Sequence, residues 1–378
     1  MIAFYVEGVY YANLFSRIVN ALSENEKKDF IFYCRNEGVS CFINSMISEP
    51  RVNCIADIGI IPSYSQFYAE HPHLADKMKK AYESSFEYIL GGRDDNLCWY
   101  AMYSNFIYLI HQINEYPIHK FIMCSGCGIG AKAAGLVCEL HGIDKQYVEL
   151  ANLPGKIFVD ALGTNAHSRL ASEPELLDKY PKVMDSLHKE WMNSYQKTKS
   201  VPPPQAAGNP LSSRIAELSQ DKVLNKKIEY IFAPLQVSND AQLWMHSDYK
   251  NADLIRYGMT LAENSGAQLV VKIHPAECST DEVEMIRTLN QRYPFKISVE
   301  PTTELLNSAC AVITINSTVG LEAMLYNKPL SILGRTYYKE FNSERLKKYI
   351  HHYLFDGIEF FSSQRINRTN ALAFLNYR

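Results

Sequence analysis

The chain has 378 residues, of which 47% are hydrophobic and 21% charged, and this composition excludes a disordered, collagenous or fibrous protein. Lys and Arg number 38 against 41 Asp and Glu, so the formal charge is −3 and there is no overall basic surface for a nucleic-acid backbone. At about 100–200 residues per domain, the length predicts two domains. The nine cysteines, an odd number spread from Cys34 to Cys310, indicate free thiols in a reducing compartment.

The amino-terminal stretch, MIAFYVEGVYYANLF, is not typical of a secretory signal because no basic region precedes its apolar run. The apolar stretch Leu305–Leu321 is interrupted by polar residues, whereas a spanning helix needs about 20 mainly apolar residues. We therefore expect a cytoplasmic protein with no membrane-spanning helix. Peripheral attachment at the inner membrane face stays open.

The first half alternates short apolar runs with amphipathic stretches. Strands are predicted at Ile2–Val6, Phe30–Tyr33, Lys120–Cys124 and Gln146–Glu149, and helices up to Leu22, from about His73 to Asn114, and up to His141.

A proline-rich stretch divides the chain. Residues 200–213, SVPPPQAAGNPLSS, hold four prolines, three of them consecutive, and such a stiff connector is not accepted inside a sheet. We place an α/β domain at 1–200, the linker at 201–213 and a second α/β domain at 214–350. A helical segment at 351–378 is predicted to pack back on the first domain.

The second half alternates more regularly. Strands are predicted at Tyr230–Ala233, Gln268–Ile273, Ile297–Val299, Ala311–Ile315 and Leu330–Leu333, and helices at Asn251–Asn264, Thr280–Tyr293 and Thr318–Leu325. Strands and helices that alternate in this way form parallel sheets with helices on both faces. The predicted fold is therefore α/β, with two Rossmann-like domains facing a cleft.

Two strand ends in the second half carry polar groups suited to an anion. The segment LVVKIHPAE places Lys272, His274 and Pro275 at the carboxyl end of a buried strand, where ligands of open α/β sheets bind. A cationic Lys and a His that donates a hydrogen bond suit a departing phosphate. A strand-end His before Pro is also a common turn, and that alternative stays open.

The segment AVITINSTVGLEAML repeats this layout about forty residues later. Ser317 and Thr318 stand at the start of a helix, whose free N–H groups and dipole favour an anion. Glu322 lies one turn later on the same face, where a carboxylate can accept the hydroxyls of a ribose. Simple helix capping by Ser317 and Thr318 is the alternative.

A third polar loop follows the first strand of the second domain. In FAPLQVSNDAQLW, Gln236, Asn239 and Asp240 come directly after a buried run. Asp240 is a nucleophile or base by one interpretation and the cap of the next helix by the other.

These segments resemble, in combination, the bacterial capsular polysaccharide biosynthesis proteins, a family that includes retaining β-Kdo glycosyltransferases of GT-B-like architecture. The resemblance rests on Gln236–Asp240, Lys272–Pro275, Asn316–Glu322 and Leu333–Tyr338, together with Glu149–Ser168 of the first half. It covers roughly residues 115–340. Bacterial sialyltransferases share the cytidine-phosphate part.

The resemblance implies a donor, CMP-Kdo, and roles for single residues. Asp240 would attack the anomeric carbon, His274 with Ser317 and Thr318 would bind the departing phosphate, and Glu322 would hold the ribose. Asp160, where members of the family often carry Glu, would be the acid/base for the acceptor hydroxyl. The further donor-binding residues implied are Gln236, Asn239, Lys272, Pro275, Asn316, Gly320, Gly334 and Tyr338, and the acceptor-side residues are Glu149, Asn152 and Asn165.

The expected partners are a CMP-sugar donor and a glycan or glycolipid acceptor, bound by the second and the first domain respectively. A leaving group with one phosphate needs little help, and no His/Cys/Asp cluster has ligand spacing, so no cofactor and no obligatory metal are expected. A CMP-sialic-acid transferase and a CDP-glycerol glycerophosphotransferase are alternatives that keep the nucleotide site.

A different class is suggested by KFIMCSGCGIGAKAAG, in which Gly126-x-Gly128-x-x-Ala131 follows a strand and precedes a helix, with Glu149 at the end of the next strand. This is a passable dinucleotide-binding fingerprint and would indicate an oxidoreductase. The same glycines also suit tight strand-to-helix packing. Cys124 and Cys127 have C-x-x-C spacing, and no second C-x-x-C motif occurs. This spacing indicates either a redox role or a chance arrangement among nine cysteines. A non-catalytic scaffold would leave Asp240 and His274 without a purpose.

Overall fold

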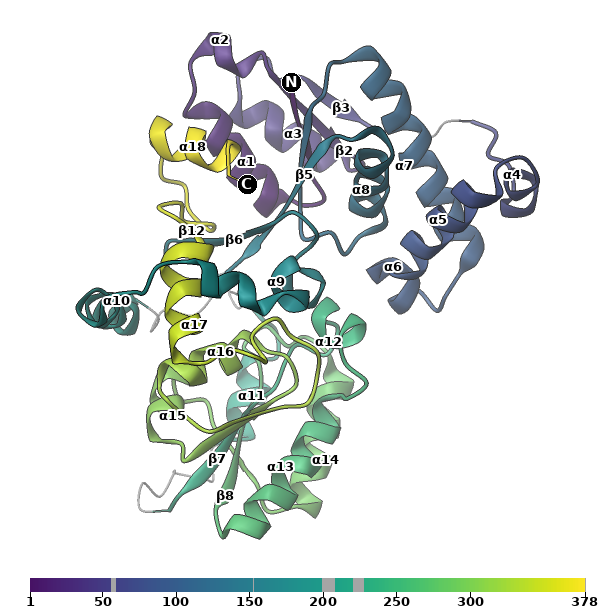
Figure 1. Ribbon diagram of the computed structural model, residues 1–378. Helices are drawn as coiled ribbons and strands as arrows, with labels where there is room; N and C mark the ends of the chain where they lie inside the picture. Colours follow the sequence, from purple (N-terminus) through teal and green to yellow (C-terminus); the bar gives the residue numbers. More distant parts are fainter. Residues whose placement is uncertain (56–58, 152, 199–207, 220–227, 378) are drawn as a thin grey trace. The chain divides into compact units, whose positions relative to one another are not determined.

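The computed structural model describes residues 1–55, 59–151, 153–198, 208–219 and 228–377 (Figure 1). The chain divides into two compact units: unit 1 is Met1–Glu173 with His352–Arg378, and unit 2 is Pro174–His351. Each unit is built on a mainly parallel sheet with helices on both faces. The predicted Rossmann-like α/β fold class is confirmed.

Unit 1 contains a seven-stranded sheet in the order β12-β6-β5-β4-β1-β2-β3, in which only β6 runs antiparallel to its neighbours. Chain order reverses between β1 and β4, and the carboxyl ends of strands at such a reversal form the crevice where α/β sheets bind ligands. The strands are β1 (Ile2–Tyr5), β2 (Phe30–Cys34), β3 (Val52–Cys54), β4 (Lys120–Met123), β5 (Asp144–Leu150), β6 (Lys156–Asp160) and β12 (Phe355–Asp356).

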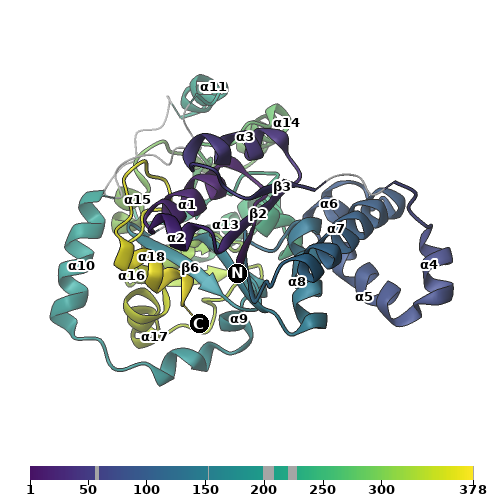
Figure 2. The same cartoon turned by 90° about the horizontal axis from the view of Figure 1, so that it is seen from above.

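Side chains alternate between two cores in this sheet. Phe4 and Phe32 pack on one face under α1, α3 and α18, while Tyr5 and Tyr33 pack on the other under α5, α7 and α8. Figure 1 shows α18 beside α1, and Figure 2 shows α5, α7 and α8 grouped together. The helices are α1 (Val9–Asn20), α2 (Glu24–Lys27), α3 (Glu37–Met46), α4 (Tyr64–Glu70), α5 (Pro72–Glu83), α6 (Phe86–Leu90), α7 (Asp95–Glu115), α8 (Ile129–His141) and α9 (Arg169–Ser172), with a 3-10 turn at Asn165–His167.

The helical region predicted from His73 to Asn114 is divided into three helices. Ser85 accepts a hydrogen bond from Tyr88 N–H and begins α6, and Asp94 accepts from Asn96 and Leu97 and begins α7. Each new helix therefore starts at a side-chain cap that satisfies N–H groups of its first turn.

The carboxyl-terminal segment belongs to unit 1 and contains β12 as well as the helix α18 (Arg368–Leu375), whereas the sequence predicted helix alone. The buried Arg17 donates to the carbonyls of Glu359 and Gln364 at 3.0 and 2.9 Å. Lys120 donates to the Leu375 carbonyl at 2.8 Å. Two cations of unit 1 thus hold backbone carbonyls of this segment.

The two units divide at Glu173, before the boundary that the prolines suggested at 201–213. Residues 201–207 of that linker lie outside the described residues. The reason for the earlier division is α10 (Asp185–Thr198), which packs within unit 2. His188 lies 3.2 Å from His351, and Tyr195 donates a hydrogen bond to Glu322.

Unit 2 contains a five-stranded parallel sheet in the order β11-β10-β7-β8-β9, and chain order reverses between β7 and β10. The strands are β7 (Tyr230–Pro234), β8 (Gln268–Lys272), β9 (Lys296–Ile297), β10 (Ala311–Thr314) and β11 (Leu330–Ile332). The helices are α10, α11 (Ser212–Glu217), α12 (Ala241–Met245), α13 (Asn251–Ser265), α14 (Thr280–Arg292), α15 (Thr302–Ser308), α16 (Thr318–Leu325) and α17 (Ser343–Lys348), with a 3-10 helix at Pro174–Lys179 and a π-helical turn at Tyr349–Tyr353.

A packing prediction concerns Gly135 of α8. A Cβ at this position would lie 2.4 Å from the Tyr147 hydroxyl oxygen, and the buried Tyr147 ring also packs close to Gly126, which limits its movement. We expect Gly135→Ala to lower the free energy of unfolding by about 1–3 kcal/mol. In a Tyr147→Phe background the clashing atom is absent, so the same change should stabilise the protein by up to about 1 kcal/mol through helix propensity. Urea denaturation of the four variants measures both signs; an equal cost in both backgrounds would contradict this packing.

Candidate functional site

Three neighbouring strands of unit 2 bring the predicted polar segments together. The loop Gln236–Asp240 follows β7, His274 follows β8, and Ser317 follows β10, with β7 between the other two. Strands lie about 4.8 Å apart, so the ends of β8 and β10 are separated by about 10 Å. The reversal of chain order between β7 and β10 lies at this edge. The edge is therefore the candidate site of unit 2.

Two buried amides fix the loop after β7. Gln236 Nε2 donates to Asn316 Oδ1 at 2.9 Å, and Asn316 N donates back to Gln236 Oε1 at 3.2 Å. Asn316 Nδ2 donates to the Gln242 carbonyl at 2.8 Å, and Asn251 bonds both backbone groups of Gln236. Gln236 and Asn316 were predicted to bind a donor, but their polar atoms are used within the protein. Their geometry favours a positioning role.

Asp240 caps a helix and keeps one oxygen unused. Its Oδ1 accepts Gln242 N–H at 2.7 Å at the start of α12. Among the described residues, Oδ2 has no hydrogen-bond partner. Burial raises the pKa of the Asp240 carboxyl, and the Gln242 N–H lowers it only in part. Asp240 can therefore cap the helix with one oxygen and act as a nucleophile or base with the other. The neighbouring Asn239 is exposed.

His274 is held in one tautomer. Ala276 N–H donates to His274 Nδ1 at 3.1 Å, so the proton of the neutral ring is on Nε2. Burial lowers the pKa of His274, Glu277 opposes this, and the Lys272 ammonium lowers it further. Nε2–H makes no hydrogen bond to another described residue. His274 thus presents a neutral donor at the carboxyl edge of the sheet.

Lys272, the last residue of β8, is bound by the segment that follows β9. Its ammonium donates to the Glu300 carbonyl, and burial lowers its pKa while Glu300 raises it in part. Pro275 contributes through its carbonyl, which accepts Asn209 Nδ2 at 2.7 Å. The Pro275 backbone is therefore part of the scaffold of the site.

Glu277 is a site residue that the sequence analysis did not single out. Its carboxylate is 1% exposed and accepts hydrogen bonds from Ser238 N and Oγ at 2.7 and 3.0 Å. Ser238 lies two residues before Asp240, so Glu277 joins the His274 turn to the Asp240 loop. The sequence does show a carboxylate two residues after the His-Pro pair, but no neighbouring residue indicates that Ser238 is its partner.

The start of α16 is built around Ser317 and Tyr338. Ser317 Oγ accepts Val319 N–H at 3.2 Å, and half-buried Thr318 is the first residue of the helix. Tyr338, which is fully buried, donates to the Ser317 carbonyl. A Cβ at Gly320 would lie 2.5 Å from the Tyr338 oxygen. Tyr338 and Gly320 thus support the helix start, and their predicted contact with the donor stays a prediction.

Gly334 has a similar structural reason. A Cβ there would lie 3.0 Å from Ile315 Cγ2 and 3.1 Å from the Ile315 carbonyl, and Gly334 N donates to that carbonyl at 2.8 Å. Gly334 therefore lets the chain after β11 approach the end of β10.

Glu322 is covered by α10. It is 3% exposed and accepts a hydrogen bond from the Tyr195 hydroxyl. The predicted contact of Glu322 with a ribose would require Tyr195 to move, so the geometry does not support it in this conformation. No local pattern pairs Tyr195 with Glu322, because more than a hundred residues separate them.

In unit 1, Asp160 is fully engaged. Oδ1 accepts N–H groups of Leu162, Gly163 and Arg169, and Oδ2 accepts Arg169 N–H at 3.0 Å and the Tyr353 hydroxyl at 2.6 Å. The residue is 6% exposed. A carboxylate with these five contacts holds the turn after β6 and the start of α9. The geometry favours this structural role over the predicted acid/base role.

The other acceptor-side predictions are also placed in unit 1. Glu149 accepts the Tyr11 hydroxyl and Leu150 N–H, both at 3.0 Å. Asn165 begins the 3-10 turn with a φ of +53°, and its carbonyl accepts Ser168 Oγ at 2.6 Å. Asn152 lies outside the described residues.

The reversal point of the unit 1 sheet carries a pair of glutamates that sequence reasoning missed. Glu7 follows β1 and accepts Ala131 N–H at 3.2 Å, and Glu87 of α6 accepts Ile129 N–H at 3.0 Å. Glu7 is exposed in part. Protein packed around its carboxyl group and the nearby Glu87 carboxylate nevertheless raise its pKa to about 7, while the Ala131 N–H and Lys132 act in the opposite direction. A carboxyl group with this pKa exchanges a proton near neutral pH.

These contacts also explain the glycine-rich turn. A Cβ at Gly128 would lie 2.4 Å from Glu7 Oε1, and one at Gly126 would lie 2.8 Å from the Tyr147 ring. The start of α8 is thus occupied by two carboxylates, which disfavour the pyrophosphate of a dinucleotide. Burial raises the pKa of the Cys124 thiol well above its usual value. Burial also raises the pKa of the Cys127 thiol to about 11, so neither is a reactive thiolate. The geometry does not favour the oxidoreductase alternative.

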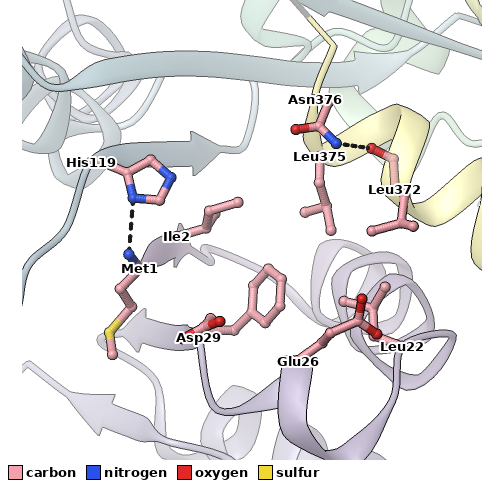
Figure 3. Close-up of a pocket in the computed structure, with 10 residues that line it drawn as sticks. Met1, Ile2, Leu22, Glu26, Asp29, His119, Leu372, Leu375 and Asn376 are labelled. Atoms are coloured by element: carbon pink, nitrogen blue, oxygen red, sulfur yellow. Dashed lines mark hydrogen bonds between the residues drawn. The ribbon is translucent and has the colours of Figure 1, made fainter.

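A separate pocket of about 310 Å³ lies at the opposite edge of the unit 1 sheet (Figure 3). Met1 and His119 line it, with the Met1 amine 2.9 Å from His119 Nδ1, and Leu375 of α18 closes one side. This pocket is at the amino ends of β1 and β4, away from the crevice at their carboxyl ends.

Within the described ranges, no three His, Cys, Asp or Glu side chains gather closely enough to hold a metal ion. The expectation of a reaction without an obligatory metal stays a prediction. No described helix has the length and apolar character needed to cross a membrane.

Comparison with known proteins finds a family similarity within unit 2. Residues 174–341 match the family described as capsule polysaccharide biosynthesis protein. This part of the chain, less than half of its length, is similar to that family. The match begins at Pro174, where unit 2 begins, so the family segment and the structural unit start together.

Two curated relatives are similar over part of their length. The capsule polysaccharide export protein KpsS of Escherichia coli is 31% identical over 140 residues, which are 33% of this chain and 36% of KpsS. Protein FixF of Sinorhizobium fredii is 26% identical over 238 residues, 61% of this chain and 52% of FixF. The chain thus matches between about a third and half of the length of these relatives.

A solved structure of KpsC from Thermosulfurimonas dismutans, described as a beta Kdo 2,7 transferase, is also similar. Its TM-score is 0.43 at 14% identity, over 71% of this chain and 88% of that chain.

The tautomer of His274 can be tested directly. We expect nitrogen-resolved NMR at pH 7.5 to show the proton on Nε2, because Nδ1 accepts from Ala276. Because burial and Lys272 lower its pKa, the ring should titrate below about 6.5, and Lys272→Met should raise that midpoint. An Nδ1–H tautomer, or a midpoint that Lys272→Met leaves unchanged, would contradict the geometry.

Proposed function

We propose that this protein is a glycosyltransferase that moves Kdo from CMP-Kdo to a glycan or glycolipid acceptor, with retention, in the biosynthesis of capsule or another surface polysaccharide. The observation that carries the proposal is the neutral Nε2–H donor of His274 at the reversal edge of unit 2, inside the part of the chain that is similar to the capsule polysaccharide biosynthesis family. The choice of CMP-Kdo as the donor follows from the resemblance of the sequence motifs to the capsular polysaccharide biosynthesis proteins.

The first step would break the bond between the anomeric carbon and the CMP phosphate. Negative charge grows on the phosphate oxygen as CMP departs, and a fixed donor aimed at that oxygen stabilises it. His274 Nε2–H suits this role because the Ala276 N–H occupies Nδ1 and keeps the ring proton on Nε2. Thr318 and the N–H groups at the start of α16 supply a second set of donors.

Asp240 fits the role of nucleophile in this scheme. Its Oδ2 would form a bond to the anomeric carbon as the bond to CMP breaks, which gives a covalent intermediate and, after a second displacement, retention. The raised pKa of the carboxyl makes its ionised form a stronger nucleophile. The Gln242 N–H at Oδ1 orients the group while Oδ2 reacts.

The second step requires a base for the acceptor hydroxyl, and we assign it to Glu7 in place of Asp160. All the oxygens of Asp160 accept hydrogen bonds that hold a turn, whereas Glu7 lies at the reversal edge of unit 1 and has a pKa of about 7. Glu7 would take the acceptor proton as the new glycosidic bond forms and the bond to Asp240 breaks.

The donor is tested by a screen of CMP-Kdo, CMP-sialic acid and CDP-glycerol with lipid and Kdo acceptors. We expect transfer from CMP-Kdo, and a loss of about 10²-fold or more in turnover for His274→Ala, because the lost interaction grows in the transition state. His352→Ala, which removes a different histidine, is the control. Transfer of glycerol phosphate instead would favour the glycerophosphotransferase alternative, and full activity of His274→Ala would remove the role of this residue.

The two roles of Asp240 can be separated by two substitutions. Asp240→Asn keeps a good helix cap, so it should fold with unchanged stability, bind CMP-Kdo and show no turnover. Asp240→Ala should in addition lose about 1 kcal/mol of unfolding free energy. Thermal denaturation and intact-protein mass spectrometry after mixing with donor measure the two effects. An active Asp240→Asn protein would reduce Asp240 to a helix cap.

Glu7 and Asp160 are distinguished by pH profiles. Since Glu7 must be ionised to act as a base, kcat/KM should rise with pH through about 7 in the wild type, and Glu7→Gln should lose about 10²-fold without that limb. Glu87→Gln should move the limb to lower pH, because Glu87 raises the pKa of Glu7. Asp160→Asn should instead cost about 1–3 kcal/mol of stability, since its amide faces N–H donors. A native-like pH limb in Glu7→Gln would return the base to another residue.

A further inference from the structure

Unit 1 contains a groove whose charge the fold does not neutralise. It has a volume of about 420 Å³ and lies among α5, α8, β5 and the loop after β6. Figure 2 shows α5 and α8 on the same side of the sheet. The charged residues that line the groove include Lys77, Lys80, Lys132, Lys145 and Glu139.

Four lysines face one glutamate in this groove. Lys77 is paired with Glu139 at 3.5 Å. Within the described part of the chain, Lys80, Lys132 and Lys145 make no ion pair and no side-chain hydrogen bond. Three ammonium groups in one groove repel each other and create a positive potential there. An anion bound in the groove would reduce this repulsion and neutralise the potential.

Lys132 makes this arrangement unusual. It is only half-exposed, and burial lowers the pKa of its ammonium, while the Cys127, Glu87 and Glu7 groups raise it in part. A partly desolvated ammonium without a close partner is costly unless a ligand pairs with it. The residue before Lys132, Ala131, donates its N–H to the Glu7 carboxylate. Lys132 therefore connects the groove to the proposed base.

The groove also offers an apolar side. Leu162, after β6, is 54% exposed and borders it, and the Tyr147 ring forms part of the wall. A free inorganic ion makes no use of such a surface, whereas an organic anion does. The combination of unpaired cations with an apolar border therefore favours an anionic group carried by a larger molecule.

We propose that Lys80, Lys132 and Lys145 bind an anionic group, a phosphate or a carboxylate, of the acceptor substrate. The proposal rests on the proposed function, because it takes unit 1 as the acceptor unit and Glu7 as the base. It assigns to this groove the task of holding the acceptor by its charge, so that a hydroxyl of the same molecule is presented to Glu7.

Lysine footprinting tests the groove without requiring turnover. The full-length protein is acetylated with limiting acetic anhydride in the absence and presence of pyrophosphate or citrate, as phosphate and carboxylate probes, and each lysine is quantified by mass spectrometry. At a probe concentration well above Kd, acetylation of Lys80, Lys132 and Lys145 should fall by about five-fold or more. The exposed Lys28 serves as the internal reference. The more protective probe identifies the kind of anion.

A double variant makes the result specific. In Lys80→Ala/Lys145→Ala the protection of Lys132 should be lost and the acceptor KM should rise by about ten-fold or more, with the donor KM unchanged. Lys28→Ala/Lys189→Ala removes the same charge elsewhere on the surface and should keep both. Equal acetylation with and without both probes, or an unchanged acceptor KM, would overturn the groove assignment. Protection without any glycosyl transfer from the donors would instead overturn the proposed function.

Discussion

The candidate site depends on one reciprocal pair of buried amides, Gln236 and Asn316. These side chains exchange two hydrogen bonds across the ends of β7 and β10, the point where the chain order of the sheet reverses. Each buried amide would cost free energy without its partner, so the pair holds the two loops in one register. Asn251 and Glu277 extend this control to the Asp240 loop and the His274 turn. Positioning residues thus surround a small number of groups that stay available for ligand.

The reversal edges of the two units share a topology but carry groups of opposite charge. The reversal edge of unit 2 presents the His274 N–H, Lys272 and the start of α16, which suit a phosphate. The start of α8 in unit 1 already holds the carboxylates of Glu7 and Glu87. Because one helix start is occupied by protein carboxylates, an anionic nucleotide is favoured at unit 2 and proton transfer at unit 1.

The sequence predicted the architecture and the segments of the site better than the tasks of single residues. Buried strands such as β7, β8 and β10 are short apolar runs, and their order with the helices predicts parallel sheets. The partners of polar side chains are set by distant residues: Tyr195 covers Glu322, and Tyr353 completes the shell of Asp160. Glu7 gave no signal because its pKa depends on Glu87 and on the packing around it. The boundary at Glu173 was missed because α10 packs on unit 2 ahead of the prolines.

A crystal structure of the protein with CMP bound tests most directly whether the reversal edge of unit 2 is the donor site. The geometry predicts a phosphate oxygen within hydrogen-bond distance of His274 Nε2 and beside the first N–H groups of α16, with Nδ1 still accepting from Ala276. CMP bound at the start of α8, or in unit 2 with His274 turned away from the phosphate, would contradict this assignment.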